Sequence, residues 1–529
     1  MNELDLWRRY QKYLCICPTI GLQVDISRML FPDDFLDTLG ERMSRAFSAM
    51  TELERGAEAN VDEHRRVGHY WLRTPELAPN PDIRADIEQT IASVKQFTKN
   101  IHEHKMVPER SDGFFVVLVI GIGGSALGAQ FVCDALGRGD DPMVVRFIDN
   151  TDPDGIDRIL EELDESLDQT LTIVISKSGD TKETRNGMLE IAAAYRRAGL
   201  NFAKHAIAIS LDGSSLHQRA VAEHWLATFP VWDWVGGRTS VLSAVGLLPT
   251  ALQGINIFAL LSGARDCDVV TRNPHMLENP AALLAAMWHF ARESCDKRNM
   301  VILPYRDRLS LFSRYLQQLV MESIGKERSR TGQIVHQGLA VYGNKGSTDQ
   351  HAFVQQLRDG VNDFFVTFIE VLRDRQEKSM MVEDSVSAGD YLHGFLYSTR
   401  EALYKNGRQS ITMILNELDA RSVGVLIALF ERAVGLYAEL IDVNAYDQPG
   451  IEACKKAAGP VLELQRRALL YLRAHRGNAF TVEAIAAGIG EPDSAETILH
   501  VLDHAAANPD HEIKLSPDAN PFTARYSMS

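Results

Sequence analysis

The chain has 529 residues, of which 45% are hydrophobic and 24% are charged, and its formal net charge at pH 7 is −16. This length exceeds the size to which a single hydrophobic core normally grows, so we expect two or more domains. The acidic balance argues against binding to nucleic acid or to an anionic membrane surface, because both depend on clustered lysine and arginine.

Neither the cysteines nor the first residues favour a secreted or membrane-bound protein. The six cysteines form no CxxC pair and no metal-type spacing with histidine, so we expect reduced thiols in the cytoplasm and no metal site. The first residues, MNELDLWRRYQKYL, lack the apolar core of a signal peptide. The uncharged stretch 239–264 is long enough to span a bilayer, but Pro249, Gln253 and Asn256 favour a pair of buried helices.

The predicted elements change character near residue 114. Residues 1–85 are expected to form a mostly helical arm, in which Asn80-Pro81-Asp82 is a typical helix start. Beyond it, short apolar runs alternate with helix-like segments, which is typical of a parallel α/β sheet. The first set of runs is 114–120, 143–148, 170–175 and 205–209, and the second set is 300–305, 338–343 and 364–371.

We therefore predict an α/β fold with two doubly wound, mostly parallel sheet domains flanked by helices. The expected ranges are a helical arm at 1–85, α/β domains at 86–275 and 276–459, and a helical extension at 460–529. The segment 394–440 is expected to be helical. Part of the tail resembles a helix-turn-helix, but acidic residues dominate its second helix, so we expect no reading of DNA.

Two serine-bearing turns follow predicted strands of the first domain and open into helix-like segments. They are GIGGSALG at 121–128 and SKSGDTKET at 176–184. Unpaired N–H groups at a helix N-terminus bind phosphate without a strongly basic pocket. In the second turn, Ser176, Ser178 and Thr181 place three hydroxyls at one helix start, which suits a terminal phosphate, although simple helix capping is the alternative. The turns predict a protein that handles a phosphorylated small molecule.

The first turn alone also fits the dinucleotide-binding pattern GxGxxA. Asp149 ends the next predicted strand, about where an acid that binds a ribose would lie. A nicotinamide-dependent dehydrogenase is therefore an alternative, against which the hydroxyl-rich second turn argues.

A helical apolar stripe borders two polar residues one turn apart, Gln318 and Glu322. The stripe consists of Leu311, Phe312, Tyr315, Leu316, Leu319 and Val320. We expect Glu322 to be partly desolvated, and desolvation makes a carboxylate a stronger base, as removal of a weakly acidic proton from carbon requires.

Two further residues suit proton transfer or stabilisation of a negative charge, although each has a plainer interpretation. His351 lies in a polar loop, where it can pass a proton at neutral pH and open a hemiacetal ring; alone, it would be assigned a structural or solvent-facing role. Arg238 follows Gly236 and Gly237, which allow close approach of a substrate. Its guanidinium could stabilise an enediolate, whereas an isolated arginine more often forms a surface ion pair.

Six motifs occur in the order seen in glucose-6-phosphate isomerases, a family that the chain resembles over residues 60–460. They are GIGGSALG, SKSGDTKET, GGRTSVLSAVG at 236–246, MESIGK at 321–326, GNKGSTDQHAF at 343–353 and YDQPGIEACK at 446–455. The resemblance implies two α/β domains of the sugar-isomerase (SIS) type and interconversion of glucose 6-phosphate and fructose 6-phosphate through a cis-enediol. It implies no cofactor, and a homodimer in which the loop histidine of one chain completes the site of the other.

The resemblance also implies a set of site residues. The implied catalytic residues are Arg238, Glu322, His351 and Lys455, the last near the ring oxygen of the sugar. The implied substrate-binding residues are Gly124, Ser125, Ser176, Lys177, Ser178, Thr181, Gln318 and Gln448.

Three departures from the family pattern bear on substrate binding. Thr239 replaces the usual aromatic residue, Asp180 stands where a small neutral residue is common, and GSTDQHAF varies the usual GTNGQHAF. Asp180 would repel a phosphate unless its side chain turns outward. Two alternatives remain open: a non-catalytic sugar-phosphate sensor, and an isomerase that also accepts mannose 6-phosphate, for which Thr239 leaves room.

Overall fold

The computed structural model describes residues 2–528, without the side chains of residues 449 and 451–458. It divides into two compact units, Met1–Asp447 and Gln448–Ser529. Both large sheets belong to the first unit, so the predicted division between two α/β domains at residue 275 stays a prediction. The second unit begins at Gln448, before the predicted boundary at 460, because helix α15 runs without a break from Pro449 to Ala474.

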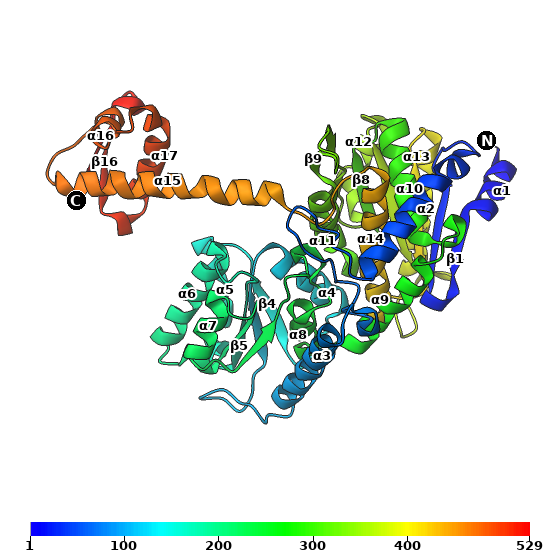
Figure 1. The fold of residues 1–529 in the computed structure, drawn as a ribbon, viewed down its shortest axis with the longest axis horizontal. Coiled ribbons are helices and arrows are strands. Elements are labelled where there is room, and N and C mark those ends of the chain that lie inside the picture. The colour runs from blue at the N-terminus through cyan, green and yellow to red at the C-terminus, as the bar shows by residue number, and fades with distance from the viewer. Residues whose placement is uncertain (1, 529) are drawn as a thin grey trace. The chain divides into compact units, whose positions relative to one another are not determined.

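The first sheet has five parallel strands in the order β4-β3-β5-β6-β7 (Figure 1). Its strands are β3 (Val116–Ile120), β4 (Val144–Ile148), β5 (Thr170–Ile175), β6 (Ala206–Ser210) and β7 (Ala227–Pro230). The first four confirm the strands predicted between residues 114 and 209.

Both faces of this sheet are buried, as parallel sheets require. Alternate residues of β3 enter different apolar clusters: Leu118 and Ile120 join one cluster, while Val117 and Val119 join the main core. The first face is covered by α5 (Pro153–Leu163), α6 (Lys182–Arg197) and α7 (Ser215–Ala222). Helices α3 (Pro81–His102), α4 (Leu127–Leu136) and α8 (Ala244–Leu252) pack on the side of the main core. As predicted, the side chain of Asn80 caps α3 by accepting a hydrogen bond from the Ile83 N–H.

The second sheet has six strands in the order β1-β2-β15-β12-β8-β11. Strands β15, β12, β8 and β11 are parallel to one another, and β2 and β1 extend the sheet as antiparallel strands. The bounds are β1 (Leu14–Cys17), β2 (Leu22–Arg28), β8 (Asn299–Pro304), β11 (Ala340–Tyr342), β12 (Phe364–Val371) and β15 (Ser410–Leu415). The expected α/β fold with two mostly parallel sheets is confirmed.

Eight helices and two small hairpins accompany this sheet among the described residues. The helices are α1 (Glu3–Tyr13), α2 (Phe35–Glu54), α9 (Ile257–Thr271), α10 (Pro280–His289), α11 (Phe312–Leu316), α12 (Val354–Asp359), α13 (Ala388–Lys405) and α14 (Ala420–Leu440). The hairpins are β9 (Lys326–Arg328) with β10 (Ile334–Gln337), and β13 (Met381–Glu383) with β14 (Val386–Ser387). Helices α8 and α9 are the buried pair expected in residues 239–264, and no helix among residues 2–528 is both long and apolar enough to cross a membrane.

The prediction of a helical arm at residues 1–85 is wrong for residues 14–28, which form β1 and β2. Alternate residues of β2, among them Leu22, Val24 and Ile26, are fully buried, and β2 pairs with β15 from the far end of the domain. The buried Asp25 carboxylate also accepts a bond of 2.6 Å from the Arg400 guanidinium. These distant contacts determine the local structure. The helix propensity of the N-terminal residues contains no information about them.

The prediction of continuous helix over residues 394–440 is also wrong. Helix α13 ends at Lys405, Gly407 adopts a left-handed conformation with φ of 69°, and β15 follows before α14 begins. All six residues of β15 are buried, and a short apolar run without periodicity does not distinguish a central strand from a buried helix.

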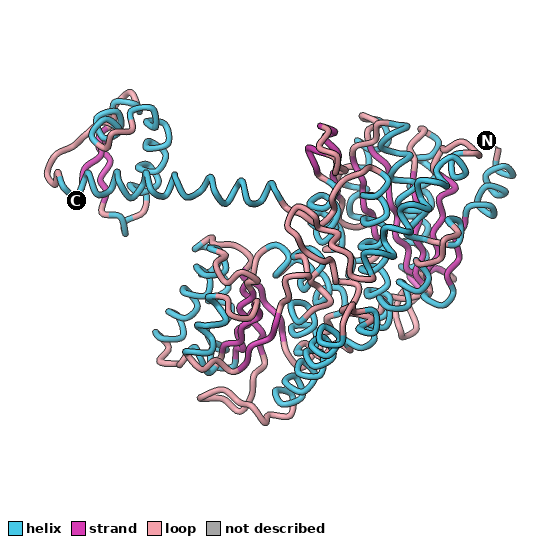
Figure 2. The backbone as a smooth tube through the Cα atoms, viewed as in Figure 1, coloured by secondary structure: helices cyan, strands magenta, loops and turns pink. Residues whose placement is uncertain are grey.

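The second unit is mainly helical, with one hairpin of strands (Figure 2). It contains α15 (Pro449–Ala474), α16 (Val482–Gly488), α17 (Ala495–Ala507), β16 (Ile513–Ser516) and β17 (Arg525–Met528). Ile485, Ile498, Leu502 and Tyr526 lie in an apolar core of its own. The predicted helical extension is therefore correct except for this hairpin.

Helices α9 and α14 approach each other closely at two glycines. A Cβ atom on Gly424 would lie 2.0 Å from the Leu260 carbonyl oxygen, and one on Gly263 would lie 1.9 Å from the Arg421 carbonyl oxygen. We predict that Gly424→Ala lowers the free energy of unfolding by about 1–3 kcal/mol or more, because the added methyl group forces the two backbones apart. Urea unfolding of the purified chain measures this change.

Gly394 on α13 provides a matched control, because nothing lies within 4 Å of a Cβ added there. Gly394→Ala is expected to leave stability unchanged or to raise it by up to about 1 kcal/mol, since alanine favours helix. Equal urea midpoints for the two variants would show that the close approach of α9 and α14 does not matter.

Candidate active site

The first glycine-rich turn, which follows β3, packs directly against the loop that carries Arg238. A Cβ on Gly124 would lie 2.1 Å from the Gly237 carbonyl oxygen, so only glycine fits there. The Ser240 hydroxyl donates a bond of 3.0 Å to the Gly124 carbonyl. On the other side of the turn, a Cβ on Gly123 would lie 3.2 Å from Nε2 of Gln318. The turn with Gly124 and Ser125, the loop of Arg238 and the side chain of Gln318 thus lie next to one another.

The second turn, which follows β5, holds its hydroxyls at the start of α6. Ser176 is buried, and its hydroxyl donates to the Thr181 hydroxyl at 3.0 Å and accepts from the Gly179 N–H at 3.1 Å. Ser178 is exposed, and its hydroxyl accepts from the Asp180 N–H at 3.3 Å. Thr181 is the N-cap residue of α6 without forming a side-chain cap, so its hydroxyl lies beside free helix N–H groups. This arrangement can receive an anion.

Thr184, in the first turn of α6, was not singled out from the sequence. Its side chain is buried, and Oγ1 has no hydrogen-bond partner among the described residues. The signal that could have found it is its place inside the SKSGDTKET motif, one turn beyond Thr181.

The Asp180 carboxylate turns away from the turn's hydroxyls. Its Oδ1 accepts a bond of 2.8 Å from the Ser215 hydroxyl at the start of α7. Gly179 packs against the same helix start, where a Cβ would lie 2.7 Å from the Leu216 nitrogen. The departure at residue 180 therefore leaves the hydroxyls unobstructed.

Lys177 links the second turn to the loop that precedes Arg238. Its ammonium donates to the carbonyls of Asp233 at 2.8 Å and Val235 at 2.7 Å. Burial lowers the pKa of Lys177 to about 8. The ammonium thus holds the two loops together, rather than pointing freely toward a ligand.

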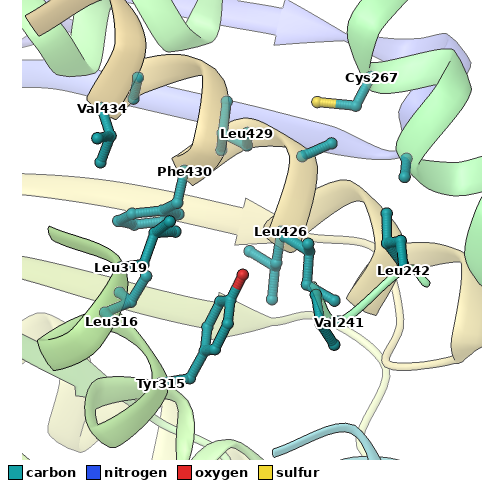
Figure 3. Packing of buried hydrophobic residues seen from close by; sticks show 14 of the residues in the cluster. Val241, Leu242, Cys267, Tyr315, Leu316, Leu319, Leu426, Leu429, Phe430 and Val434 are labelled. Carbon is teal, nitrogen blue, oxygen red and sulfur yellow. The ribbon is translucent and has the colours of Figure 1, made fainter. Parts of the chain in front are cut away.

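Glu322 ends a π-helical segment, Gln317–Glu322, that continues α11. This segment packs on α14, where Leu316 and Leu319 lie against Phe430 (Figure 3). The predicted apolar stripe is buried except for Leu311, which is half-buried. The Glu322 side chain is 14% exposed, which confirms that it is partly desolvated. Single π-type turns inside helices frequently occur at functional sites.

Arg238 connects Glu322 to two other segments. Nη1 lies 3.2 Å from Oε1 of Glu322, and Nε donates to the Ser323 hydroxyl at 2.8 Å. Nη2 donates to the Ala445 carbonyl and, at 3.0 Å, to the Asp447 carbonyl. The Arg238 side chain is only 3% exposed, and burial holds its pKa below the ordinary value, although the Glu322 charge opposes that shift.

Lys326 is a further residue of this network to which the sequence gave no role, although it ends the MESIGK motif. Its buried ammonium donates to the Asp447 carbonyl at 2.9 Å and forms an ion pair with the Asp447 carboxylate. Lys326 and Arg238 together fix the backbone at Asp447. The motif itself was the available signal.

His351 ends a short helical turn, Thr348–His351, and is exposed. The buried Asp349 organises this loop, because its carboxylate accepts from the N–H groups of Asn344 at 2.7 Å and Lys345 at 3.1 Å. Among the described residues, His351 has no side-chain hydrogen bond, so its imidazole is available to a substrate.

Gln448 and Lys455 lie in the second unit. Gln448 precedes α15, and Lys455 lies within it. The side chain of Lys455 lies outside the part of the chain whose side chains are described. Its predicted role in ring opening therefore stays a prediction.

Asp149, the residue considered above as the ribose-binding acid of a dehydrogenase, is already bonded to other side chains of the protein. Asp149 Oδ2 accepts from the Gln130 amide at 2.9 Å and from the Arg314 guanidinium at 3.1 Å. Within residues 2–528, no group of three or more His, Cys, Asp or Glu side chains is arranged to hold a metal ion. The site itself offers a carboxylate beside a buried guanidinium and an anion-receiving helix start.

Comparisons with known proteins agree with this arrangement. Residues 25–469 match the phosphoglucose isomerase family. The chain is 58% identical over 526 residues to a glucose-6-phosphate isomerase of Geotalea daltonii, with 99% of each chain covered, and 59% identical over 529 residues to one of Geobacter sulfurreducens, with 100% of each covered. A crystal structure of a glucose-6-phosphate isomerase from Chlamydia trachomatis matches with a TM-score of 0.79 and 26% identity, covering 87% of this chain and 91% of that one. The chain belongs to the phosphoglucose isomerase family.

Proposed function

We propose that this chain is an aldose–ketose isomerase that interconverts glucose 6-phosphate and fructose 6-phosphate in the cytoplasm. The observation that carries the proposal is the partly buried carboxylate of Glu322, held 3.2 Å from the Arg238 guanidinium. The relatives named glucose-6-phosphate isomerase, which span the whole chain at 58–59% identity, support it.

The phosphate group binds at the second turn. The hydroxyls of Ser176, Ser178 and Thr181 and the free N–H groups at the start of α6 supply donors to its oxygens. Gly124, Ser125, Gln318 and Gln448 contact the sugar, and Lys177 fixes the phosphate turn against the Arg238 loop. His351 and Lys455 open the ring, because an imidazole side chain can accept and donate a proton.

Glu322 then moves a proton between C2 and C1 of the open-chain sugar through a cis-enediol. When the carboxylate takes the proton, its negative charge passes to the developing enediolate. The Arg238 guanidinium, which is paired with Glu322 before this step, is placed to stabilise the charge after it. The cation therefore does not need to move far during the reaction.

Two alternatives have specific tests. A sugar-phosphate sensor requires the turns but not the Glu322–Arg238 pair. An isomerase that also accepts mannose 6-phosphate requires extra room beside the sugar, for which Thr239 is a candidate. A coupled assay that follows fructose 6-phosphate conversion separates enzyme from sensor, and repeating it with mannose 6-phosphate measures breadth. Absence of isomerisation by the purified parent chain would refute the proposal.

Glu322→Gln is predicted to lower kcat by about 10²–10⁴-fold, because an amide cannot accept the sugar proton. Binding of fructose 6-phosphate, measured by calorimetry, should remain. Glu327→Gln is the matched control, since Glu327 is 60% exposed and pairs only with its neighbour Arg328. If Glu322→Gln turned over substrate as fast as the control, Glu322 could not be the base.

Replacing both Ser176 and Thr181 with Ala is predicted to raise KM for fructose 6-phosphate by about tenfold or more, since each hydrogen bond to a charged group contributes roughly 1.5–3 kcal/mol. The double variant Ser48→Ala, Thr51→Ala is the control, because these exposed hydroxyls on α2 bond only to carbonyls of their own helix. An unchanged KM in the first variant would contradict the assignment of the phosphate turn.

The proposal includes a homodimer in which His351 serves the site of the neighbouring chain. Mixing Glu322→Gln chains with His351→Ala chains would then create dimers with one intact site. After dissociation and reassociation in equal amounts, about a quarter of the parent activity is predicted, because half of the dimers are mixed and each has one working site. Activity no higher than that of the separate variants would mean that each chain uses its own histidine.

A further inference from the structure

A cavity of about 410 Å³ opens at the carboxyl ends of three adjacent parallel strands of the second sheet. Arg306 follows β8, Arg373 and Arg375 follow β12, and Glu417 follows β15. The carboxyl edge of a parallel α/β sheet is where such folds bind ligands, and this volume falls within the range of small-molecule pockets. None of the residues assigned above to the isomerase site lines this cavity.

Five arginines line the cavity, and most of them lack a carboxylate partner. Arg373 pairs with Glu417 at 3.0 Å. Arg308 donates to the Gly137 carbonyl at 2.8 Å, which leaves its charge unneutralised. For Arg138, Arg306 and Arg375, no ion pair is formed by any side chain that the structure describes. Four of the five arginines thus form no ion pair with a side chain that the structure describes, although four carboxylates also line the cavity.

Four acids line the cavity, but in the described part of the chain only Glu417 forms an ion pair with one of its arginines. Asp419 caps α14 by accepting from the Ser422 N–H at 2.7 Å, and Glu417 is already paired. The Asp374 carboxylate lies against Gly389 at the start of α13. Glu377 is exposed, and no ion pair joins it to an arginine in the described part of the chain.

Arg306 is the best placed of the four to meet a ligand, because it is half-buried. Burial lowers its pKa; the nearby Asp374 charge opposes this shift, and the charges of Arg308 and Arg375 add to it. Mutual repulsion of this kind is relieved when an anion binds between the guanidiniums.

We propose that this cavity is a second ligand site, which binds a small molecule that carries two or more phosphate groups. Guanidinium groups bind phosphate through two parallel N–H bonds, and four of them exceed what a single phosphate needs. Arg138 and Arg308 also line a neighbouring cavity of about 590 Å³, so the two charged ends of one ligand can lie apart.

Calorimetric titration of the full chain with inorganic pyrophosphate tests this site. The titrations use a Ser176→Ala, Thr181→Ala background, so that binding at the isomerase site does not mask the result. In this background, Arg306→Gln with Arg375→Gln is expected to weaken pyrophosphate binding by about tenfold or more. The control pair, Arg8→Gln with Arg197→Gln, removes two exposed arginines that form no ion pair with described residues, and it should bind as the background does.

Inorganic phosphate provides a second arm, because a ligand with one phosphate should bind at least about tenfold more weakly than pyrophosphate. The exposed Arg375→Gln change alone should also weaken binding, so the test holds even if the double variant folds poorly. The proposal is overturned if the background binds no pyrophosphate, if the Arg306 and Arg375 variants bind it as tightly as the control pair, or if phosphate binds equally well. Each of these outcomes leaves the isomerase assay of the parent chain unaffected.

Discussion

The buried guanidinium of Arg238 is the contact on which the candidate site depends. A cation removed from water is unfavourable unless its N–H groups are satisfied, and here they bind Glu322, Ser323 and the carbonyls of Ala445 and Asp447. These partners lie on the π-helical segment after α11 and on the segment that ends the first unit, while Arg238 itself belongs to the loop after the first sheet. Satisfying one side chain therefore fixes three distant segments relative to one another.

A second ionic cluster supports α14, the helix against which the segment carrying Glu322 packs. Arg73 binds Asp268 and Glu431, and Arg432 binds Asp268 and Glu54, with every side chain of the cluster buried. Burial raises the pKa of Glu431 to about 7, whereas Arg73 and Arg432 overcome burial and lower the pKa of Asp268 to about 2. Because Glu431 and Arg432 follow Phe430 on α14, the cluster anchors the helix against which Leu316 and Leu319 pack (Figure 3). Removing one partner would leave a buried charge unpaired. This lowers the stability of the fold far more than if the charge had never been buried.

Local sequence was sufficient where the pattern belongs to one segment. The runs 170–175 and 364–371 are bounded by turn residues and became β5 and β12, and Asn80 was identified as a cap from its own three-residue context. It failed at β2 and β15, which pair with each other across nearly the whole domain, and at β1, which pairs with β2. The same limit applies to the site. Desolvation of Glu322 followed from its helix, but its pairing with Arg238 joins segments that no local pattern connects, and only the ordered motifs of the family indicated it.

Phosphate binding in so acidic a chain must rest on local geometry rather than on net charge. Lys177, the cation nearest the second turn in sequence, is committed to the carbonyls of Asp233 and Val235, and Asp180 is turned toward Ser215. Besides Lys182, the first residue of α6, the turn offers hydroxyls and the free N–H groups of α6, which are neutral donors reinforced by the helix dipole. Neutral donors attract a phosphate mainly through short contacts. The strength of binding therefore depends on the fit of the phosphate and little on long-range attraction. The arginine-lined cavity of the second sheet works by a different principle, because several of its guanidinium groups form no ion pair with a described side chain, and it is there that ionic strength should matter most.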